Sequence, residues 1–336
     1  MIAAETPRGA LIATELAEKV AREHYGIEAR AERLTGEWDE NFRLHVAGAP
    51  GYVLKVAHAS ERPEVMELPT AALLHVARVD PELPCPRVVP SCAGSNRVTF
   101  LDAGGAPRTA FLYTFLLGEP LMMARRSPVQ RAACGRLLAR LGHTLREFSH
   151  PATRRILVWD LKQLPRIREV LRQLPDLKHT RFFSEFLARY ETEILPRLSR
   201  LRSQPVHNDF NARNLLVDPN AESRITGIID FGDLVHTALV ADVAVGAIGQ
   251  LAAPDTAERS IREFVAGYCG VEPLIAEELD VLGWLVAGRI VQNVVVTSWY
   301  RARNSSAEHF ESFNTEYFEW RIALAERLAA GPSPFR

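Results

Sequence analysis

The most informative segment of this chain is Pro205-Val-His-Asn-Asp-Phe-Asn-Ala-Arg-Asn-Leu-Leu-Val217. It contains His207, Asp209 and Asn214 in the pattern H-x-D-x-x-x-x-N. In phosphoryl transfer, a carboxylate accepts the proton of the acceptor hydroxyl, and an amide oxygen a few residues later helps to hold magnesium at the phosphates. We therefore interpret Asp209 as the catalytic residue, Asn214 as a metal ligand and His207 as a support of the loop.

A second motif follows in Gly227-Ile-Ile-Asp-Phe-Gly-Asp233, in which two apolar residues lead into Asp230. The carboxylate of an Asp-Phe-Gly at a strand end typically bridges metal and phosphates. Strands at 215–217 and 225–229 would form a hairpin that brings Asp209 and Asp230 side by side. An isolated Asp-Phe-Gly is also common as a plain turn after a strand. The two motifs together, in this order, indicate a kinase.

The segments around these motifs predict a β-rich block followed by an α-rich block. Helices are expected at 11–25, 63–79, 128–148, 180–201, 277–303 and 313–328 and from 239 onward, and strands at 28–34, 42–46, 52–56, 98–101 and 110–115. We therefore expect an α+β, two-lobed, protein-kinase-like fold. The expected N-lobe is 1–117, the C-lobe is 118–330, and 331–336 is a disordered tail.

Lys55 is the candidate phosphate-binding lysine. It is one of only four lysines, and it lies between Leu54 and Val56 in a predicted strand of the N-lobe. The alternative is an edge-strand lysine that faces water. A phosphate-binding lysine requires an acidic partner on the helix that follows. Glu67 is the preferred partner, and Glu64 is the alternative.

The segment Thr35-Gly-Glu-Trp-Asp-Glu-Asn-Phe42, between the first two strands, should cover the phosphates. It has one glycine and lacks G-x-G-x-x-G, which argues against a protein kinase and for a small-molecule kinase. Asn41 either turns toward a phosphate or belongs to a plain polar hairpin. The backbone from Thr114 to Leu116, where the lobes would be linked, is expected to meet the nucleobase.

Composition excludes several other classes of protein. The 40 basic and 41 acidic residues give a net charge of -1, so neither nucleic acid nor a membrane surface is an expected partner. Charged or polar residues interrupt the apolar stretches 238–253 and 281–296, so no transmembrane helix is expected. The start of the chain does not resemble a signal peptide. The four cysteines show no C-x-x-C spacing, which predicts neither disulfides nor zinc and favours the cytoplasm.

With these motifs the chain resembles the aminoglycoside phosphotransferase superfamily, which also covers choline, homoserine and methylthioribose kinases. Within it, the sequence is most similar to the hydroxylysine kinase branch. The segments that carry this similarity are Glu37-Trp-Asp-Glu-Asn-Phe42, Leu157-Val-Trp-Asp-Leu161, Asp230-Phe-Gly-Asp-Leu-Val-His236, and Arg289 onward through Tyr300. The resemblance implies Mg²⁺-dependent transfer of the γ-phosphate of ATP or GTP to an alcohol.

A buried charge requires partners. Asp242 lies in an otherwise apolar helix, and we interpret it as a cap that accepts backbone N–H bonds from the catalytic loop.

A hydroxylysine-like acceptor carries an ammonium and a carboxylate. The ammonium would meet Asp233 or Asp160, although Asp233 fits a helix N-cap equally well. The carboxylate would meet Arg289, whose planar fork pairs with such groups. Arg289 could instead form a structural ion pair with Asp242 or Glu278. Trp159 and His236 are candidates to line the pocket, although Trp159 fits packing between lobes better.

We expect 5-hydroxylysine or a related amino alcohol as the acceptor. An aminoglycoside phosphotransferase is the alternative within the class, with Glu308, Glu311, Glu316 and Glu319 as an acidic pocket or, more simply, a solvated face. A nucleotide-binding pseudokinase is the alternative from another class. The presence of the catalytic aspartate, the metal-binding asparagine and the lysine argues against it.

Overall fold

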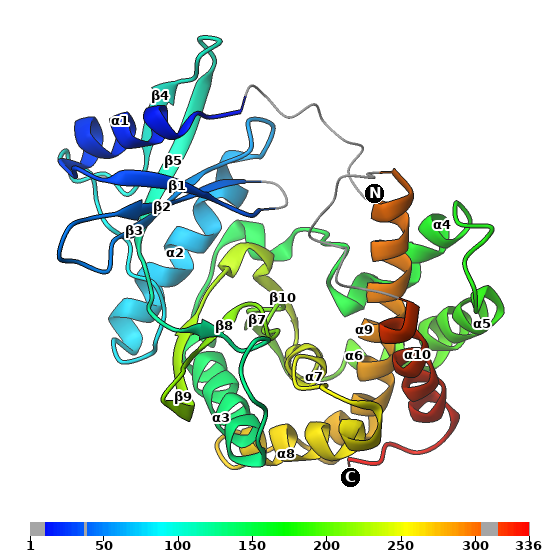
Figure 1. Cartoon of the computed structure of the whole chain (residues 1–336). Helices are drawn as coiled ribbons and strands as arrows, with labels where there is room; N and C mark the ends of the chain where they lie inside the picture. Colours follow the sequence, from blue (N-terminus) through cyan, green and yellow to red (C-terminus); the bar gives the residue numbers. More distant parts are fainter. Residues whose placement is uncertain (1–10, 37–38, 304–314, 336) are drawn as a thin grey trace. The chain divides into compact units, whose positions relative to one another are not determined.

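The computed structural model describes residues 11–36, 39–303 and 315–335, and it divides into two compact units (Figure 1). The N-lobe comprises Ile2–Gly118 with Thr226–Gly232, and the C-lobe comprises Glu119–Ile225 with Asp233–Arg336. The first change of unit comes one residue after the expected boundary. The prediction of two continuous lobes is wrong in one respect, because the short segment that carries Asp230 belongs to the N-lobe unit.

The N-lobe is a five-stranded antiparallel sheet with two helices. Its elements are α1 (Thr14–Tyr25), β1 (Arg30–Leu34), β2 (Glu40–His45), β3 (Tyr52–Val56), α2 (Pro63–Val79), β4 (Val98–Leu101) and β5 (Pro107–Thr114). The strand order is β1-β2-β3-β5-β4. Alternation along the strands buries Phe42, Leu44, Leu54 and Leu112 in one core with Val20 of α1. Helix α1 therefore covers one face of the sheet (Figure 1).

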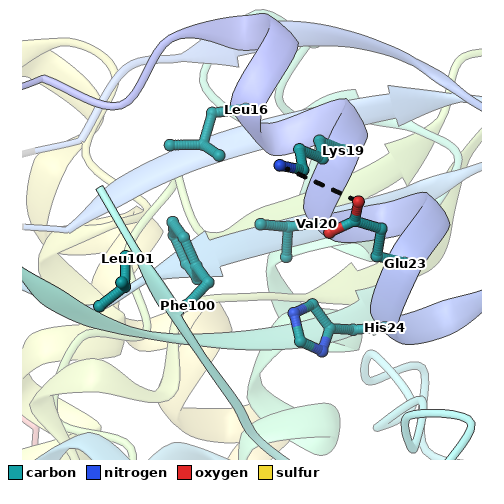
Figure 2. Close-up of a pocket in the computed structure, with 7 residues that line it drawn as sticks. All are labelled: Leu16, Lys19, Val20, Glu23, His24, Phe100 and Leu101. Atoms are coloured by element: carbon teal, nitrogen blue, oxygen red, sulfur yellow. Dashed lines mark ion pairs between the residues drawn. The ribbon is translucent and has the colours of Figure 1, made fainter. Parts of the chain in front are cut away.

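Figure 2 shows a pocket between α1 and β4, on this helix-covered side of the N-lobe. Its lining residues are Leu16, Lys19, Val20, Glu23, His24, Phe100 and Leu101. None of them is a candidate site residue from the sequence.

The C-lobe is mainly helical. Its helices are α3 (Pro128–Leu145), η1 (Pro151–Arg154), η2 (Leu161–Ile167), α4 (Arg168–Leu171), α5 (Thr180–Arg189), η3 (Tyr190–Ile194), α6 (Leu195–Leu198), η4 (Phe231–Asp233), α7 (Leu239–Ile248), η5 (Pro254–Thr256), α8 (Ala257–Cys269), α9 (Ala276–Arg303) and α10 (Thr315–Ala330). Its strands are β6 (Glu119–Pro120), β7 (Ser203–Val206), β8 (Leu215–Asp218), β9 (Ala221–Ile228) and β10 (Val235–Ala238). They form the small sheets β6-β8-β9 and β10-β7. Strand β9 ends within Thr226–Gly232, the short segment that belongs to the N-lobe unit. Helix η4 begins in the same segment.

The helix expected at 180–201 is continuous from Thr180 to Leu198 and consists of α5, the π-helical turn η3 and α6. Pro196 follows the π-helical turn closely and has no N–H with which to continue the i to i−4 ladder. The missing donor accounts for the change of helix type at this point.

Two glycines allow α3 and α8 to pack closely. A Cβ on Gly267 would lie 2.2 Å from the carbonyl oxygen of Ala132, and a Cβ on Gly135 would lie 2.1 Å from that of Phe264. Both distances are far inside van der Waals contact, so neither position has room for a side chain while the two helices keep this spacing.

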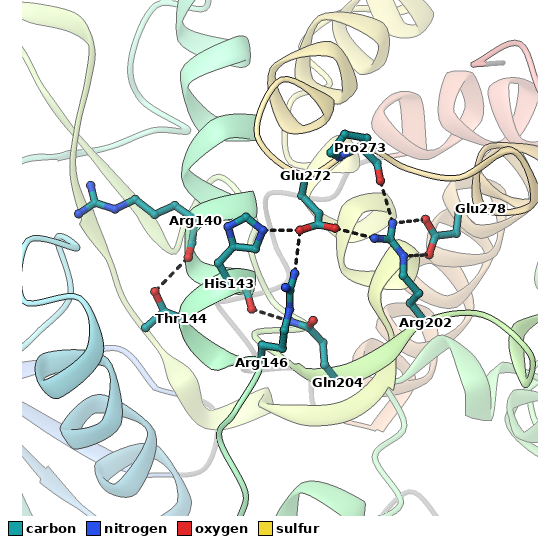
Figure 3. A network of polar contacts seen from close by, with 10 residues as sticks. Arg140, His143, Thr144, Arg146, Arg202, Gln204, Glu272, Pro273 and Glu278 are labelled. Carbon is teal, nitrogen blue, oxygen red and sulfur yellow. Dashed lines mark hydrogen bonds and ion pairs between the residues drawn. The ribbon is translucent and has the colours of Figure 1, made fainter.

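Helix α9 is long and apolar enough to cross a membrane by length and composition, but 83% of its most apolar window is buried within the structure. It is therefore a core helix of the C-lobe. At its start, Glu278 is fully buried and binds Arg202, whose guanidinium also pairs with Glu272 (Figure 3). Glu272 also binds His143 and Arg146 of the α3 region. This network ties α3, β7 and α9 together.

The end of the chain is not a disordered tail over the part that the structure describes. Phe335 is buried, and Pro334 lies beside Gly283 of α9. The prediction is wrong here because an aromatic side chain at the end of the chain packs onto the core.

Candidate active site

The catalytic loop connects β7 to β8 and turns sharply at Asn208. This residue has φ of 63°, in the left-handed region that asparagine tolerates better than most residues. Its backbone N–H donates to the carboxylate of Asp242 at 2.8 Å, and the backbone of His207 binds the same carboxylate. The contact expected of Asp242 from the sequence is therefore present. Burial raises the pKa of Asp242 to about 7, against the opposing effects of these two backbone donors and the charge of Arg289.

The carboxylate of Asp209 is held by side chains of its own loop. Its Oδ1 accepts from Nδ2 of Asn211 at 2.8 Å, and its Oδ2 accepts from Nδ2 of Asn214 at 2.6 Å. The backbone N–H of Asp209 donates to Nδ1 of His207 at 3.2 Å. Asn211 is a member of this group that the sequence reasoning missed, although its position between the two motif residues was a signal.

Arg289 of α9 also points at Asp209. Its Nη2 lies 3.4 Å from Oδ1 of Asp209, and its Nη1 donates to the carbonyl of Trp159 at 2.6 Å and to Oε1 of Gln292 at 3.1 Å. The guanidinium also lies 5.0 Å from the centre of the Trp159 ring, in cation–π contact. Burial lowers the pKa of Arg289, while the charges of Asp209, Asp233 and other carboxylates oppose that shift.

The ion-pair partners suggested for Arg289 from the sequence are corrected. Its ion pair is with Asp209, whereas Glu278 binds Arg202 and Asp242 acts on Arg289 through its charge. Sequence alone did not anticipate a contact between α9 and Asp209.

Asp160 does not fit its predicted role as a ligand of the acceptor ammonium. Its side chain is fully buried and accepts from the hydroxyl of Thr237 at 2.8 Å and from the backbone N–H of Lys162 at 2.9 Å. It is the N-cap of η2. A carboxylate used in this way is enclosed by the fold and inaccessible to a ligand from solvent.

Two other candidates for acceptor binding are partly exposed. Asp233 ends η4 and contributes negative charge at Arg289. The carbonyl of His236 accepts from Nζ of Lys162 at 2.8 Å. Burial lowers the pKa of the His236 ring, and the charges of Lys162 and Arg154 lower it further.

In the N-lobe, Lys55 does not pair with Glu67 or Glu64. Its Nζ lies 2.9 Å from Oδ2 of Asp39, the residue directly before β2. Glu67 binds Arg97, and Glu64 pairs with Arg62. Both predicted partners are therefore corrected, because the nearer carboxylate comes from the loop before β2 rather than from α2.

Asp230 lies two residues after the end of β9 and has φ of 60°. Its Oδ1 accepts from the backbone N–H of Gly232 at 3.1 Å, and the side chain is otherwise exposed. Burial lowers the pKa of Lys55, but the charges of Asp39 and Asp230 and the bond to Asp39 together raise it above its ordinary value.

Of the remaining nucleotide candidates, Asn41 and Thr114 lie in strands of the N-lobe sheet, and Leu116 follows the end of β5. Asn41 of β2 lies opposite Lys55 of β3 in the strand register, with its side-chain amide beside Gly36. Thr114 exchanges hydrogen bonds with the backbone of Arg87, and Leu116 is partly exposed. Two members of the loop over the phosphates, Glu37 and Trp38, lie outside the described residues.

Asn214 and Asp230 each offer an oxygen donor of the kind that magnesium binds. Among the described residues there is no group of three or more histidine, cysteine, aspartate or glutamate side chains that could hold a metal. Mg²⁺ in kinases takes only one or two protein oxygens and completes its shell with phosphates and water. The Oδ1 of Asn214 and the carboxylate of Asp230 are hard oxygen donors of the required kind.

Comparisons with known proteins agree with these observations. Residues 30–285 match the model of the APH phosphotransferase enzyme family. Hydroxylysine kinase of Danio rerio is 28% identical over 292 residues, covering 83% of this chain and 82% of that protein. Hydroxylysine kinase of Mus musculus is 26% identical over 284 residues, covering 78% and 75%.

Solved structures share the fold. A microcompartment-associated aminopropanol kinase superposes with a TM-score of 0.69 at 20% identity, covering 95% of this chain and 98% of that one. An amicoumacin kinase, solved with AMP-PNP and Ca²⁺, superposes with a TM-score of 0.67 at 15% identity, covering 96% and 95%. The expected two-lobed, protein-kinase-like α+β fold is thereby confirmed.

Proposed function

The chain belongs to the phosphotransferase enzyme family and is a small-molecule kinase, and we propose that it moves the γ-phosphate of ATP or GTP to a hydroxyl of a small metabolite that bears an amino group. The best candidate for that acceptor is 5-hydroxylysine. The observation that carries the proposal is the carboxylate of Asp209, which Asn211, Asn214 and Arg289 hold from three directions.

Each motif residue has a separate role in this reaction. Asp209 accepts the proton of the acceptor hydroxyl and orients its oxygen. Asn214 and Asp230 would hold Mg²⁺, which neutralises charge on the phosphates when it is bound. Lys55 adds a second positive charge at the phosphates. Asp242 keeps the catalytic loop in its turn by accepting backbone N–H groups.

The acceptor class follows from charge. Asp233, partly exposed, is suited to an ammonium group, and the guanidinium of Arg289 is suited to a carboxylate. 5-Hydroxylysine carries both groups and a hydroxyl. The sequence similarity to hydroxylysine kinases over about four fifths of the chain supports the same choice.

The aminoglycoside alternative has less support. Glu308 and Glu311 lie outside the described residues, and the side chain of Glu316 is not described. Glu319 pairs with Lys178 and His179, so its charge is already balanced. The presence of Asp209, Asn214 and Lys55 argues against the pseudokinase alternative.

A transfer assay tests the proposal. Purified protein with Mg²⁺ is supplied with ATP and GTP in parallel, and with 5-hydroxylysine, homoserine, choline, ethanolamine and aminoglycosides as acceptors. We expect turnover of 5-hydroxylysine well above that of the other acceptors. Preference for another acceptor would overturn the substrate, and no transfer to any of them would favour a pseudokinase.

A further inference from the structure

The ammonium of Lys55 is held by one carboxylate that is itself fixed. Oδ2 of Asp39 lies 2.9 Å from Nζ of Lys55, and the two side chains are only 24% and 21% exposed. The other oxygen of Asp39 accepts the backbone N–H of His58 at 3.0 Å. His58 lies two residues beyond the end of β3, the strand that carries Lys55. The carboxylate is therefore tied at one oxygen to the same strand segment whose lysine it binds at the other.

The glutamates of α2 are engaged elsewhere. Glu67 binds Arg97, and Glu64 pairs with Arg62 at 3.3 Å, both near the surface of the N-lobe. Within residues 11–36, 39–303 and 315–335, the ion pair of Lys55 is with Asp39.

We propose that Asp39 is the positioning residue of Lys55 and takes the place that a glutamate of α2 would have in a protein kinase. This inference rests on the proposed function, because it assigns Lys55 to the phosphates of a nucleotide. The ammonium of a lysine lies at the end of a flexible four-carbon chain, so a carboxylate in a fixed position determines where the ammonium lies. Because Asp39 belongs to the connection between β1 and β2, the position of Lys55 depends on that connection and not on α2.

The variant Asp39→Asn separates this role from a structural one. Asparagine keeps an oxygen for the N–H of His58 but presents no negative charge to Lys55. We expect the thermal midpoint to stay close to that of the wild type. We expect kcat/KM for the nucleotide to fall on the order of 10–100-fold, the loss typical of one charge-assisted hydrogen bond.

Three further variants serve as controls. Glu67→Gln removes the glutamate expected from the sequence and should leave kcat/KM within about twofold of the wild type, since surface ion pairs contribute little. Asp39→Glu keeps the charge and should give values between those of the wild type and Asp39→Asn. In a Lys55→Met background, Asp39→Asn should have little further effect, because the partner is already gone.

Direct measurement of nucleotide dissociation constants makes the outcomes distinct. A loss in Glu67→Gln without a loss in Asp39→Asn would overturn the inference. Tighter nucleotide binding by Asp39→Asn would also overturn it, because Asp39 would then compete with the phosphates for Lys55. If the wild type binds nucleotide but transfers to no acceptor, the proposed function fails. The nucleotide dissociation constants of Asp39→Asn and Glu67→Gln still decide the role of Asp39 in that case. If the wild type binds no nucleotide, both fail.

Discussion

Nη2 of Arg289 lies 3.4 Å from Oδ1 of Asp209, so a buried helix of the C-lobe presents a cation to the carboxylate that we propose as catalytic. The guanidinium is fixed by the carbonyl of Trp159, the side chain of Gln292 and the face of the Trp159 ring. An arginine with so many contacts has little freedom to move. It therefore places a fixed positive charge beside the Asp209 carboxylate, which Asn211 and Asn214 also hold.

We predict that Arg289→Lys lowers kcat for every acceptor, because a lysine cannot reproduce the planar fork that contacts three partners at once. The expected loss is on the order of 10–100-fold, as for a charge-assisted hydrogen bond. The dissociation constant of the nucleotide should not change. If Arg289 also meets the acceptor carboxylate, KM should rise more for 5-hydroxylysine than for ethanolamine.

A matched control is Arg321→Lys, which alters an equally buried arginine that stacks on Tyr317 and Trp320 of α10. It should affect stability rather than kcat. Equal loss of kcat in both variants would mean that Arg289 acts only through packing.

We predict that Asp209→Ala loses turnover on the order of 10²–10⁴-fold, the usual contribution of a positioned general base. The nucleotide should still bind, because Lys55 and Asp230 are unchanged. Steady-state kinetics and nucleotide titration measure the two effects separately. Turnover like that of the wild type would remove Asp209 from its assigned role.

A third prediction concerns the close packing of α3 and α8. Gly267→Ala would place a methyl group 2.2 Å from the carbonyl oxygen of Ala132, and only a shift of the helices could relieve that contact. Overpacking of this kind costs about 1–3 kcal/mol of unfolding free energy. Denaturant unfolding followed by circular dichroism would measure it.

Gly270→Ala is the control, since its added Cβ would meet atoms no nearer than 3.5 Å at a φ of −65°. It should leave the unfolding midpoint nearly unchanged. Similar midpoints for the two variants would show that the helices adjust without cost.

Motifs with local patterns could be predicted from the sequence. The apolar run that leads into Asp230 and the loop from His207 to Asn214 are each determined by residues close together in the chain. The strand and the loop could therefore be predicted from the sequence. The partner of Lys55 could not, because α2 and the loop before β2 both offer carboxylates and only the folded N-lobe brings Asp39 closest. The role of Asn208 was also hidden, because a left-handed φ leaves no periodic signal.

Arg289 marks a second limit of the same kind. Its position in an apolar helix predicted burial and an ion pair, but not which carboxylate would be its partner. That choice depends on how α9 packs against the catalytic loop, over a separation of 80 residues. Asp160 shows a different limit. It was expected near the acceptor pocket, but it caps a helix and is buried within its own lobe.

The last prediction follows from the raised pKa of Asp242, about 7 against an ordinary 3.8. A carboxyl whose pKa is raised in the fold binds its proton more tightly there than in the unfolded chain. Its contribution therefore favours the folded state at low pH and is lost as the pH rises from about 4 to about 7.

Asp242→Asn has no such titration. The thermal midpoint of the wild type minus that of Asp242→Asn should consequently be larger at pH 5 than at pH 8. An Asp242→Asn difference that is constant between the two pH values would mean that Asp242 stays ionised throughout, held by Arg289 and the loop N–H groups.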